Sequence, residues 1–422
     1  MHKIERLLQT LAPKGVEFRK LGDIGEFTRG NGLLKSDLQD KGRPVVHYGQ
    51  IHTQYNLSID KTISYVNDAL FHKLKKAKPN DILIATTSEN VKDVGKSIAW
   101  LGNEEIAFSG DMYSYSTNEN PKFIIYYFQT WFFQKEKEKR ITGTKVMRIH
   151  ENDLKKITIP IPPLEIQQEI VKILDAFTEL NTELNTELKA RKKQYQYYQN
   201  MLLDFKDTNQ NHKDAKMSAK TYPKRLQTLL QTLAPKGVEF RKLGEVCEII
   251  RGKRVTKKEI LDKGKYPVVS GGIGFMGYLN EYNREENTIT IAQYGTAGFV
   301  NWQNQKFWAN DVCFSVIPKE TLINRYLYYV LTNMQNYLYS ISNRSAIPYS
   351  ISSNNIMQIT IPIPPLEIQQ EIVKILDQFL ALTTDLLAGI PAEIKARKKQ
   401  YEYYREKLLT FKPLTPYKKV KK

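Results

Sequence analysis

The sequence has little cysteine and no long apolar run. Its only cysteines, Cys247 and Cys313, can build neither a disulfide framework nor a zinc site with several thiolates. The longest apolar stretch, residues 123–133, is about half the length of a transmembrane helix and is interrupted by Gln129 and Thr130. The first ten residues include a glutamate and lead into polar sequence, unlike a secretory signal. We therefore expect a cytoplasmic protein that contacts no membrane.

Patterns that mark catalytic sites are also missing. Residues 95–97 (GKS) resemble the end of a phosphate-binding loop, but Asn90 stands where that loop needs glycine. Residues 272–277 match G-x-G-x-x-G, yet polar sequence follows where a packed helix is required, so we interpret them as a glycine-rich turn. The six histidines show no metal-binding spacing, and the N-P-P-[FY] motif of base-methylating enzymes does not occur. We predict no catalytic, cofactor-binding or metal-binding residues on this chain.

The chain has fewer acidic than basic residues. The chain has 63 Lys and Arg against 45 Asp and Glu, a formal net charge of +18. An excess of this size raises the local concentration of polyanions. A solvated basic surface would have the same composition, so charge favours nucleic-acid binding without establishing it.

The sequence contains a long internal repeat. The sixteen residues LLQTLAPKGVEFRKLG occur at 7–22 and again at 229–244, and the nineteen residues ITIPIPPLEIQQEIVKILD occur at 157–175 and at 359–377. KARKKQ also occurs twice, at 189–194 and 395–400. The chain is therefore a tandem duplication. Identical segments are expected to do one job twice, while the divergent segments between them can recognise different ligands.

The divergent segments read as mixed α/β globules. Residues 81–85, 288–292 and 312–317 are β-branched runs that predict strands. Residues 123–133 and 326–337 look helical. The two segments share only short sequence matches: PVV at 44–46 and 267–269, Asp111 with Asp311, and a Tyr-Tyr pair at 126–127 and 328–329.

The repeated C-terminal part of each half predicts a long amphipathic helix. Apolar or ring-bearing positions recur at steps of three and four residues, at Phe177, Leu180, Leu184, Leu188, Arg191, Tyr195, Tyr198 and Leu202. A helix over residues 163–205 would be about 65 Å long. The second copy, residues 366–411, should break at Gly389 and restart at Pro391. Each helix could pack on its own globule, but we favour pairing of the two, because the stripe is longer than a globule could cover.

These segments resemble the specificity subunit of type I restriction–modification enzymes. The resemblance rests on two copies of I-P-[IL]-P-P-L-x-x-Q-x-x-I-V-x-x-L-D, each after a variable α/β region and each followed by K-A-R-K-K-Q-Y-x-Y-Y. It implies an α+β fold with a pseudo-two-fold repeat, in which two target recognition domains are separated by an antiparallel coiled coil. Each domain would read one half of a split DNA sequence.

The resemblance also implies partners and cofactors. Two modification subunits would methylate adenine with S-adenosylmethionine, and restriction subunits would complete a nuclease that uses ATP and Mg²⁺. The chain itself would bind double-stranded DNA and neither cofactor.

A short tandem repeat fits the same family. Residues 178–188 read TELNTELNTEL, and each four-residue unit would lengthen a helix by about 6 Å. In the family, copy number at this position sets the spacer between half-sites. The same residues also form an ordinary amphipathic stretch, and both interpretations can hold together. The second helix departs from the first at this point, with ALTTDLLAGIPAEI.

The expected domains follow these landmarks. We predict an N-terminal recognition domain at 1–158, a first helix at 159–205, a linker at 206–223, a C-terminal recognition domain at 224–360, a second helix at 361–412 and a basic tail at 413–422.

Candidate DNA-reading residues are polar and basic side chains expected in loops between strands, although surface exposure alone would also account for any of them. In the first half they are Arg29, Lys35, Tyr48, Gln50, Thr86, Thr87, Ser88, Lys145 and Arg148. In the second half they are Arg251, Lys253, Arg254, Gln293, Tyr294, Thr296, Asn343, Arg344 and Tyr349. The KARKKQY segments are expected to face partner subunits or phosphates instead of bases.

Two other classes of protein stay open. A fused methyltransferase and nuclease is opposed by the missing catalytic motifs. A coiled-coil scaffold or architectural DNA binder would remain unaffected by modification subunits, whereas a specificity subunit would form a stoichiometric complex with them.

Overall fold

The chain forms two compact units. The structure, a computed structural model, describes residues 2–205, 222–345, 347–384 and 389–414. Unit 1 contains residues 1–184 and 394–422, and unit 2 contains residues 185–393. Most of the predicted linker at 206–223 and of the predicted tail at 413–422 lies outside the described residues. Each unit combines one divergent segment with the start of one long helix and the end of the other.

Unit 1 is built, over the residues that the structure describes, on two sheets and two short strand pairs. In spatial order the main sheet contains β2 (Gly25–Arg29), β11 (Met112–Thr117), β7 (Ile82–Ala85), β9 (Ser97–Trp100) and β4 (Ser58–Ile59). The second sheet contains β5 (Ser64–Val66), β3 (Arg43–Val46), β10 (Ile106–Phe108) and β6 (Lys76–Ala77). The short pairs join β1 (Glu17–Lys20) to β13 (Thr158–Ile161) and β8 (Thr87–Ser88) to β12 (Met147–Arg148).

Helices cover these sheets. They are α1 (His2–Leu11), α2 (Leu21–Ile24), α3 (Tyr48–Thr53), α4 (Asp68–Lys73), α5 (Pro121–Phe128), α6 (Trp131–Glu138), α7 (Glu151–Leu154) and a short 3₁₀ turn at Lys35–Asp37. Strand β7 is buried on both faces. Alternate side chains of a strand point to opposite sides, so its residues pack into two different clusters. Ile82 and Ile84 pack in the cluster that contains α5, while Leu83 and Ala85 pack with residues of the second sheet.

Unit 2 repeats this plan in a shorter form. Among the described residues its main sheet contains β15 (Cys247–Arg251), β21 (Cys313–Pro318), β18 (Thr288–Ala292) and β19 (Val300–Gln303). The second sheet contains β17 (Tyr278–Leu279), β16 (Tyr266–Val269) and β20 (Trp308–Ala309), and β14 (Glu239–Lys242) pairs with β22 (Thr360–Ile363). Its helices are α9 (Lys224–Leu233), α10 (Leu243–Val246), α11 (Asn324–Asn333), α12 (Gln335–Ser340) and α13 (Ser353–Met357). The strand order β15-β21-β18-β19 matches β2-β11-β7-β9, and β7, β18 and β21 confirm the three predicted strands.

Each of the two predicted globule helices is in fact a pair of helices. The break in unit 1 falls at Gln129 and Thr130, because Thr130 has an extended backbone and its hydroxyl accepts a hydrogen bond from the amide of Phe133. A threonine in this arrangement caps a new helix instead of continuing the old one. In unit 2 the corresponding junction lies at Met334, between α11 and α12.

The long helices agree with the sequence pattern. Helix α8 (Leu164–Leu203) is continuous, and its eight predicted stripe positions are buried or half-buried. The second copy consists of α14 (Leu366–Thr384) and α15 (Ile390–Leu408), with Pro391 in the first turn of α15, as predicted. Within the described chain no helix is long and apolar enough to cross a membrane.

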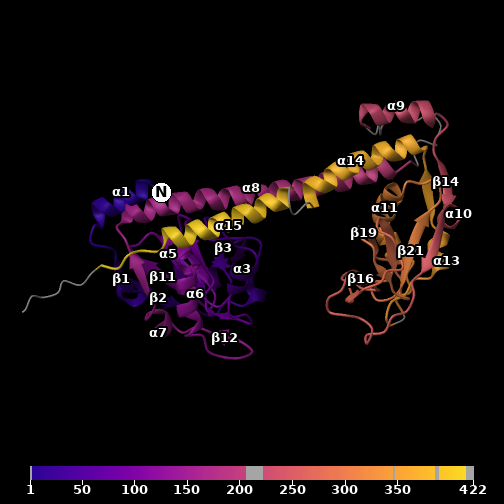
Figure 1. The fold of residues 1–422 in the computed structure, drawn as a ribbon. Helices are drawn as coiled ribbons and strands as arrows, with labels where there is room; N and C mark the ends of the chain where they lie inside the picture. Colours follow the sequence, from indigo (N-terminus) through magenta and orange to yellow (C-terminus); the bar gives the residue numbers. More distant parts are fainter. Residues whose placement is uncertain (1, 206–221, 346, 385–388, 415–422) are drawn as a thin grey trace, which may run out of the picture. The chain divides into compact units, whose positions relative to one another are not determined.

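The long helices pair within each unit. In unit 1 the rings of Phe177 on α8 and Tyr404 on α15 stack with centroids 5.5 Å apart, and in unit 2 Tyr198 on α8 stacks on Phe379 of α14 at 5.0 Å. The paired helices run in opposite directions in each unit (Figure 1). The start of each helix also packs on its own globule, so the two alternatives from the sequence both hold.

A carboxylate attaches the start of each long helix to its unit in the same way twice. Asp175 accepts hydrogen bonds from Lys122 (2.6 Å) and the Tyr126 hydroxyl (2.7 Å). Its counterpart Asp377 accepts from Arg325 (2.9 Å) and from the Tyr329 hydroxyl. The equivalent of Tyr126 is therefore Tyr329, one residue off the alignment of the two Tyr-Tyr pairs.

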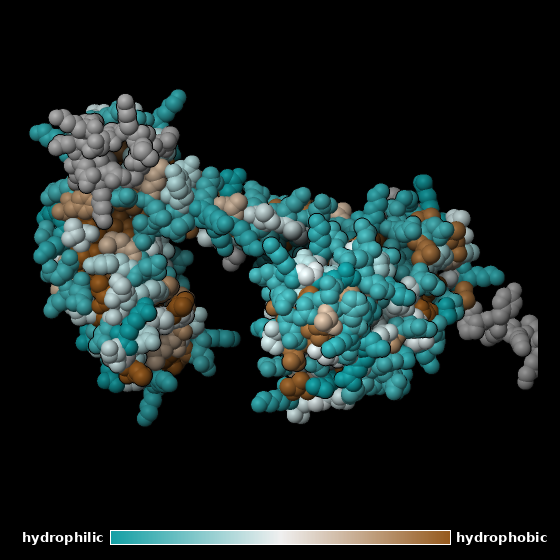
Figure 2. All heavy atoms as spheres, turned by 180° about the vertical axis from the view of Figure 1, so that it is seen from behind, coloured by the Kyte–Doolittle hydropathy of each residue, from teal (hydrophilic) through white to brown (hydrophobic). Residues whose placement is uncertain are grey.

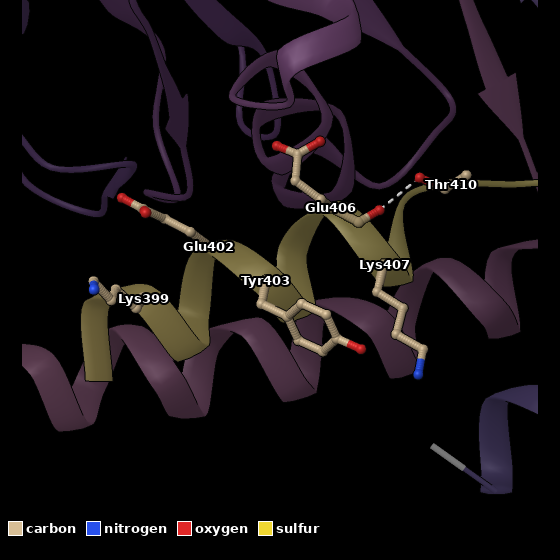
Figure 3. A pocket seen from close by; sticks show the side chains of 6 residues that line it. All are labelled: Lys399, Glu402, Tyr403, Glu406, Lys407 and Thr410. Atoms are coloured by element: carbon tan, nitrogen blue, oxygen red, sulfur yellow. Dashed lines mark hydrogen bonds between the residues drawn. The ribbon is translucent and has the colours of Figure 1, made fainter. Parts of the chain in front are cut away.

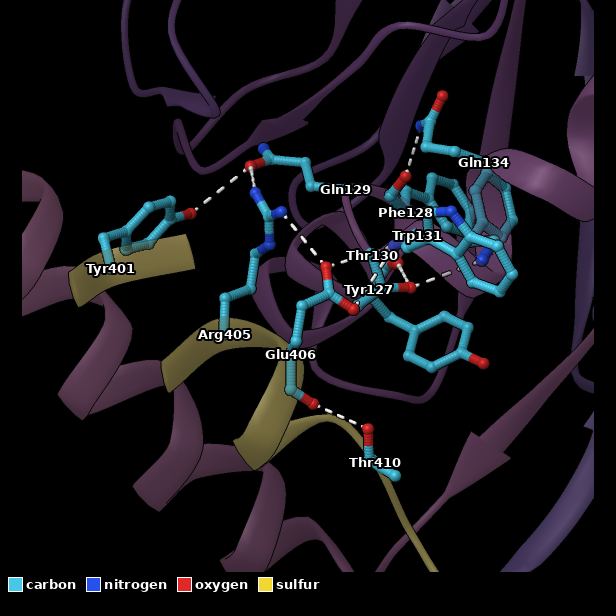
Figure 4. A network of polar contacts seen from close by, with 11 residues as sticks. Tyr127, Phe128, Gln129, Thr130, Trp131, Gln134, Tyr401, Arg405, Glu406 and Thr410 are labelled. Atoms are coloured by element: carbon cyan, nitrogen blue, oxygen red, sulfur yellow. Dashed lines mark hydrogen bonds and ion pairs between the residues drawn. The ribbon is translucent and has the colours of Figure 1, made fainter. Parts of the chain in front are cut away.

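The end of each long helix enters the core of the unit that holds the other half's globule. On α15 and just after it, Leu408, Leu409 and Phe411 belong to the core of unit 1. Gln129 accepts hydrogen bonds from Tyr401 (3.3 Å) and Arg405 (3.4 Å), and Glu406 accepts one from the amide of Trp131 (Figure 4). On α8, Leu202, Leu203 and Phe205 belong to the core of unit 2.

Candidate nucleic-acid interface

Both units carry the same backbone frame at the end of a buried strand. After β7, the Thr86 amide donates to the Asp111 carbonyl (2.9 Å) and the Thr86 carbonyl accepts from Ile149 (3.1 Å). After β18, Gln293 donates to Val312 (2.9 Å) and accepts from Ile351 (2.9 Å). The residues that follow, 87–88 and 294, pair with a returning segment that ends at Arg148 in unit 1 and at Ser350 in unit 2. This frame places the candidate residues on corresponding loops.

A tight loop projects from the frame in each unit. In unit 1, Thr142 and Arg148 exchange two backbone hydrogen bonds of 2.9 and 2.8 Å. In unit 2, Asn343 and Ser350 do the same at 2.7 and 3.1 Å. The candidates Lys145, Asn343, Arg344 and Tyr349 are exposed on these loops.

Four candidates of unit 1 line one hollow. Arg29, Lys35, Tyr48 and Arg148 surround it together with Asn31, His47 and Asp111. Arg29 donates to the Gly110 carbonyl (3.4 Å), and the Arg148 guanidinium lies 3.9 Å from the Asp111 carboxylate. Burial lowers the pKa of His47, and the charge of Lys35 lowers it further, while Asp111 acts in the opposite direction. The hollow therefore presents exposed cations beside the rings of His47 and Tyr48, whose centroids are 4.6 Å apart.

The candidates of unit 2 fall into two groups. Arg251 is exposed at the end of β15, and Lys253 and Arg254 are exposed just after it. Arg251 donates to the Asp311 carbonyl (2.7 Å), and the Lys253 ammonium lies 6.0 Å from the Trp308 ring centroid. The second group lies around residues 294–296. Thr296 donates to Gly271 (2.7 Å) and the Gly295 amide donates to Tyr349 (3.1 Å). The glycine-rich turn and the loop 343–350 are both anchored on this one segment, and no helix follows the turn, as predicted.

Five candidates have buried or half-buried structural positions instead of exposed ones. Gln50 is buried, accepts from the His47 amide (2.9 Å) and donates to Ser64 (2.7 Å). Thr86 is buried and donates to Asp111. Thr87 and Gln293 each have a buried side-chain oxygen for which the described residues offer no hydrogen-bond partner. Ser88 is half-buried beside them. These side chains shape the loops before any contact with a ligand.

Metal ligands do not gather anywhere in the part of the chain that the structure describes. There, no group of three or more His, Cys, Asp or Glu side chains is placed to hold an ion. Cys247 and Cys313 are buried as free thiols, and burial raises the pKa of each to about 12.

Comparison with known proteins assigns the chain to a family. A model of the type I restriction modification DNA specificity domain matches twice, over residues 13–194 and 235–396. The chain belongs to the family of type I restriction–modification specificity subunits. The EcoR124I/EcoR124II specificity subunit of Escherichia coli is 28% identical, with 98% of each chain covered. A Mycoplasma pneumoniae protein named as a type I specificity subunit is 31% identical over 60% of this chain and 96% of its own length.

Solved structures have the same fold. The S subunit of a type I restriction–modification system from M. genitalium aligns with a TM-score of 0.59 at 18% identity, over 94% of this chain and 96% of its own. A chain from work on complex assembly and conformational transition of the type I system aligns at 0.57, with 18% identity and coverage of 94% and 97%. The predicted α+β fold with two repeats is thus confirmed, and specificity subunits are the non-catalytic, DNA-recognising members of these systems.

An Arg-Gly pair in this specificity subunit is a sequence signal that a search for polar loop residues overlooks. The pair recurs at 29–30 and 251–252. A Cβ on Gly30 would clash with the Ser109 carbonyl oxygen, and one on Gly252 would clash with that of Asn310. Only glycine allows this approach, and the arginines beside these glycines donate to the Gly110 carbonyl and to the Asp311 carbonyl. The side chains of Asn31 and His47, which also line the hollow, carry no comparable signal.

Each KARKKQY segment of the specificity subunit is followed, two residues after its last tyrosine, by an exposed tyrosine. Tyr197 is 63% exposed and Tyr403 is 60% exposed, although the tyrosine after each is half-buried. Around Tyr403, α15 carries Lys399, Glu402, Glu406 and Lys407, and Thr410 follows just after the helix (Figure 3). An exposed tyrosine ring at the same position of both helices is a feature that two copies of one partner could use.

Proposed function

We propose that each unit of this specificity subunit reads one half of a split DNA target. The observation that carries the proposal is the common frame at β7 and β18, which presents different side chains in the two units. In unit 1, Arg29, Lys35 and Arg148 would contact phosphates or guanines around the hollow, with Tyr48 beside them. In unit 2, Arg251, Lys253, Arg254 and Arg344 would supply the cations, and Tyr294, Thr296, Asn343 and Tyr349 the polar contacts.

The long helices would set the distance between the two half-sites and dock two modification subunits. Identical segments suit identical partners, and Tyr197 and Tyr403 are the residues we assign to the two docking surfaces. The recognition domains would then be residues 1–158 and 224–360, with helices at 159–205 and 361–412. S-adenosylmethionine would act on the modification subunits, and ATP and Mg²⁺ on restriction subunits, in the cytoplasm where double-stranded DNA is present.

The test is methylation sequencing of DNA from cells that express this chain with its adjacent modification subunit. A split motif with one methyladenine on each strand is expected. Two variants show which unit reads which half of the target. Arg29→Ala should weaken or relax the half read by unit 1, and Arg254→Ala the half read by unit 2.

Copurification separates the remaining outcomes. If the two proteins copurify but no split motif appears, the reading function is wrong for this chain. If they do not copurify, the chain is an architectural DNA binder and the docking assignment is wrong as well.

A further inference from the structure

We propose that Ile347 is a specificity-determining residue of unit 2, which makes an apolar contact with a base of the half-site. The inference rests on the proposed function and adds a residue type that polar-residue reasoning leaves out. Ile347 is 98% exposed, so its side chain has almost no neighbour in the unit that displays it. Isoleucine is among the residues most often found buried, and a ligand that covers this side chain would gain free energy by removing its apolar surface from water.

The loop that carries Ile347 is anchored at its base. Asn343 and Ser350 close it with two backbone hydrogen bonds, and the Asn343 side chain accepts a further one from Ser345 (3.0 Å). The Tyr349 carbonyl accepts from Gly295, which fixes the loop to the frame at the end of β18. A fixed base can hold an apolar tip in register with a binding partner at a small entropic cost.

Unit 1 presents a counterpart in the same place. Its loop closes between Thr142 and Arg148, and Val146 at the tip is 48% exposed. Gly143 makes the tight turn possible, because its φ is +94° and a Cβ there would clash with the Val146 carbonyl oxygen. Both loops therefore carry an exposed β-branched residue beyond a basic one, Lys145 in unit 1 and Arg344 in unit 2.

A second loop of unit 2 adds apolar surface next to the same anchor. Ile273 is 68% exposed and Phe275 is 48% exposed, in the glycine-rich turn that follows Gly271, whose carbonyl accepts from Thr296. Figure 2 shows hydrophobic side chains at the end of unit 2 that is remote from α9. Exposed apolar side chains thus occur on two loops of unit 2 that are fixed to the same segment.

The position of Ile347 favours DNA over a protein partner. Segments that dock identical partners are expected to stay identical, as KARKKQY has. The loops 142–148 and 343–350 differ in sequence and in length, so they face whatever differs between the two sides, which is the half-site. A basic neighbour also suits a phosphate backbone. The chemistry available to an aliphatic tip in the major groove is contact with the 5-methyl group of thymine.

The experiment first establishes the split motif with the wild-type chain and its modification subunit, and then replaces single residues. Ile347→Ala should lower modification or make one position degenerate in the half-site of unit 2, while the other half-site is unchanged. Val146→Ala should affect the opposite half-site. Leu233→Ala is the matched control, because Leu233 is 40% exposed on α9 at the other end of unit 2.

A binding measurement then tests the chemistry. Oligonucleotides in which uracil replaces each thymine of that half-site remove one methyl group at a time. One replacement should weaken binding of the wild-type complex about fourfold, the equivalent of about 0.8 kcal/mol for one buried carbon. The same replacement should have no effect on Ile347→Ala. If Ile347→Ala keeps the wild-type motif and the wild-type response to uracil, this inference is overturned while the proposed function stands. If the wild-type chain gives no split motif, the proposed function itself fails.

Discussion

At the scale of single residues, two buried glutamines join the long helices to their units. Gln167 is completely buried; it accepts from the Asn120 amide (3.0 Å) and donates to the Pro162 carbonyl (2.8 Å). Gln369 repeats these contacts with Ile323 (2.8 Å) and Pro364 (2.8 Å). Both glutamines lie in the nineteen-residue repeat, which explains why that segment stays identical: it performs the same attachment twice.

Replacing Gln167 with leucine should therefore destabilise unit 1. The substitution leaves the half-buried Asn120 amide and the buried Pro162 carbonyl without the partner that Gln167 supplies, and we expect a loss of about 2 to 4 kcal/mol in the free energy of unfolding. Urea unfolding measures it. Gln196→Leu, at an exposed position of the same helix, is the control and should change stability by less than about 0.5 kcal/mol. Equal effects of the two substitutions would contradict this role.

A buried lysine makes unit 1 sensitive to pH. Lys137 is 1% exposed, its ammonium group donates to the Lys92 carbonyl (3.0 Å), and burial lowers its pKa to about 8. Between pH 8 and the unperturbed value near 10.5, the unfolded chain holds this proton and the folded chain does not. The unfolded state then binds more protons, so this group makes the protein more stable as pH rises through that range.

The Lys137→Met variant tests this linkage. It should be more stable than the wild type at pH 7 by an amount that shrinks as pH approaches 10, with an upper limit of about 3 kcal/mol from the pKa difference. Urea unfolding at pH 7, 8.5 and 10 compares the two proteins. Parallel stability profiles would mean that Lys137 does not titrate in this range.

At the scale of elements, each long helix serves both units. Its first half belongs to the unit of the preceding globule, and its last residues fill the core of the other unit. Leu202 is fully buried at the end of α8 in unit 2, and Leu408 is buried at the end of α15 in unit 1. Amphipathic periodicity predicts the stripe on each helix but gives no information about which globule receives its end.

Substitution of each of the two leucines should destabilise one unit and leave the other unchanged. Leu202→Ala should destabilise unit 2 and Leu408→Ala unit 1, each by about 2 to 5 kcal/mol. Hydrogen exchange should accelerate in β18 for the first variant and in β7 for the second. Gln196→Ala and Lys399→Ala, at exposed positions of the same helices, should leave both strands protected. The opposite pattern would show that each helix end packs on its own globule.

At the scale of the whole molecule, the two copies of the long-helix segment are not equal in length. Fourteen residues separate Asp175 from Lys189, and eighteen separate Asp377 from Lys395. The TELN units lie in the shorter copy. In the proposed function, the length of this helix decides how many base pairs separate the half-sites.

Deletion of one TELN unit should shorten the spacer and leave both half-sites unchanged. Four residues correspond to about 6 Å of helix and slightly more than one turn, so the stripe stays nearly in phase. Methylation sequencing of cells that express the deletion variant measures the motif. Replacing the same unit with four alanines keeps the helix length and should keep the wild-type spacer. A changed half-site in the deletion variant would contradict a pure spacer role.

Much of the fold was predictable because it depends on local and repeated patterns. The duplication, the strands β7, β18 and β21, the continuous α8 and the restart at Pro391 all follow from periodicity, propensity and identity within one chain. The helix pairs in the globules did not, because the capping hydrogen bond of Thr130 decides where α5 ends. For the candidate DNA-reading residues, the sequence supplied charge and polarity, which cannot separate exposed Arg29 from buried Gln50.

Family membership and the two-fold plan follow from the sequence alone, and the sequence also supplies the candidate residues for DNA contact. Which of those residues meet depends on how the chain folds. Arg29 and Arg148 are far apart in the chain, and it is the pairing of β12 with β8 and of β2 with β11 that brings both to one hollow. The exposure of Ile347 is likewise a property of the folded unit. Hydrophobicity predicts burial on average, and an exposed aliphatic tip is visible only when the contacts around it are known.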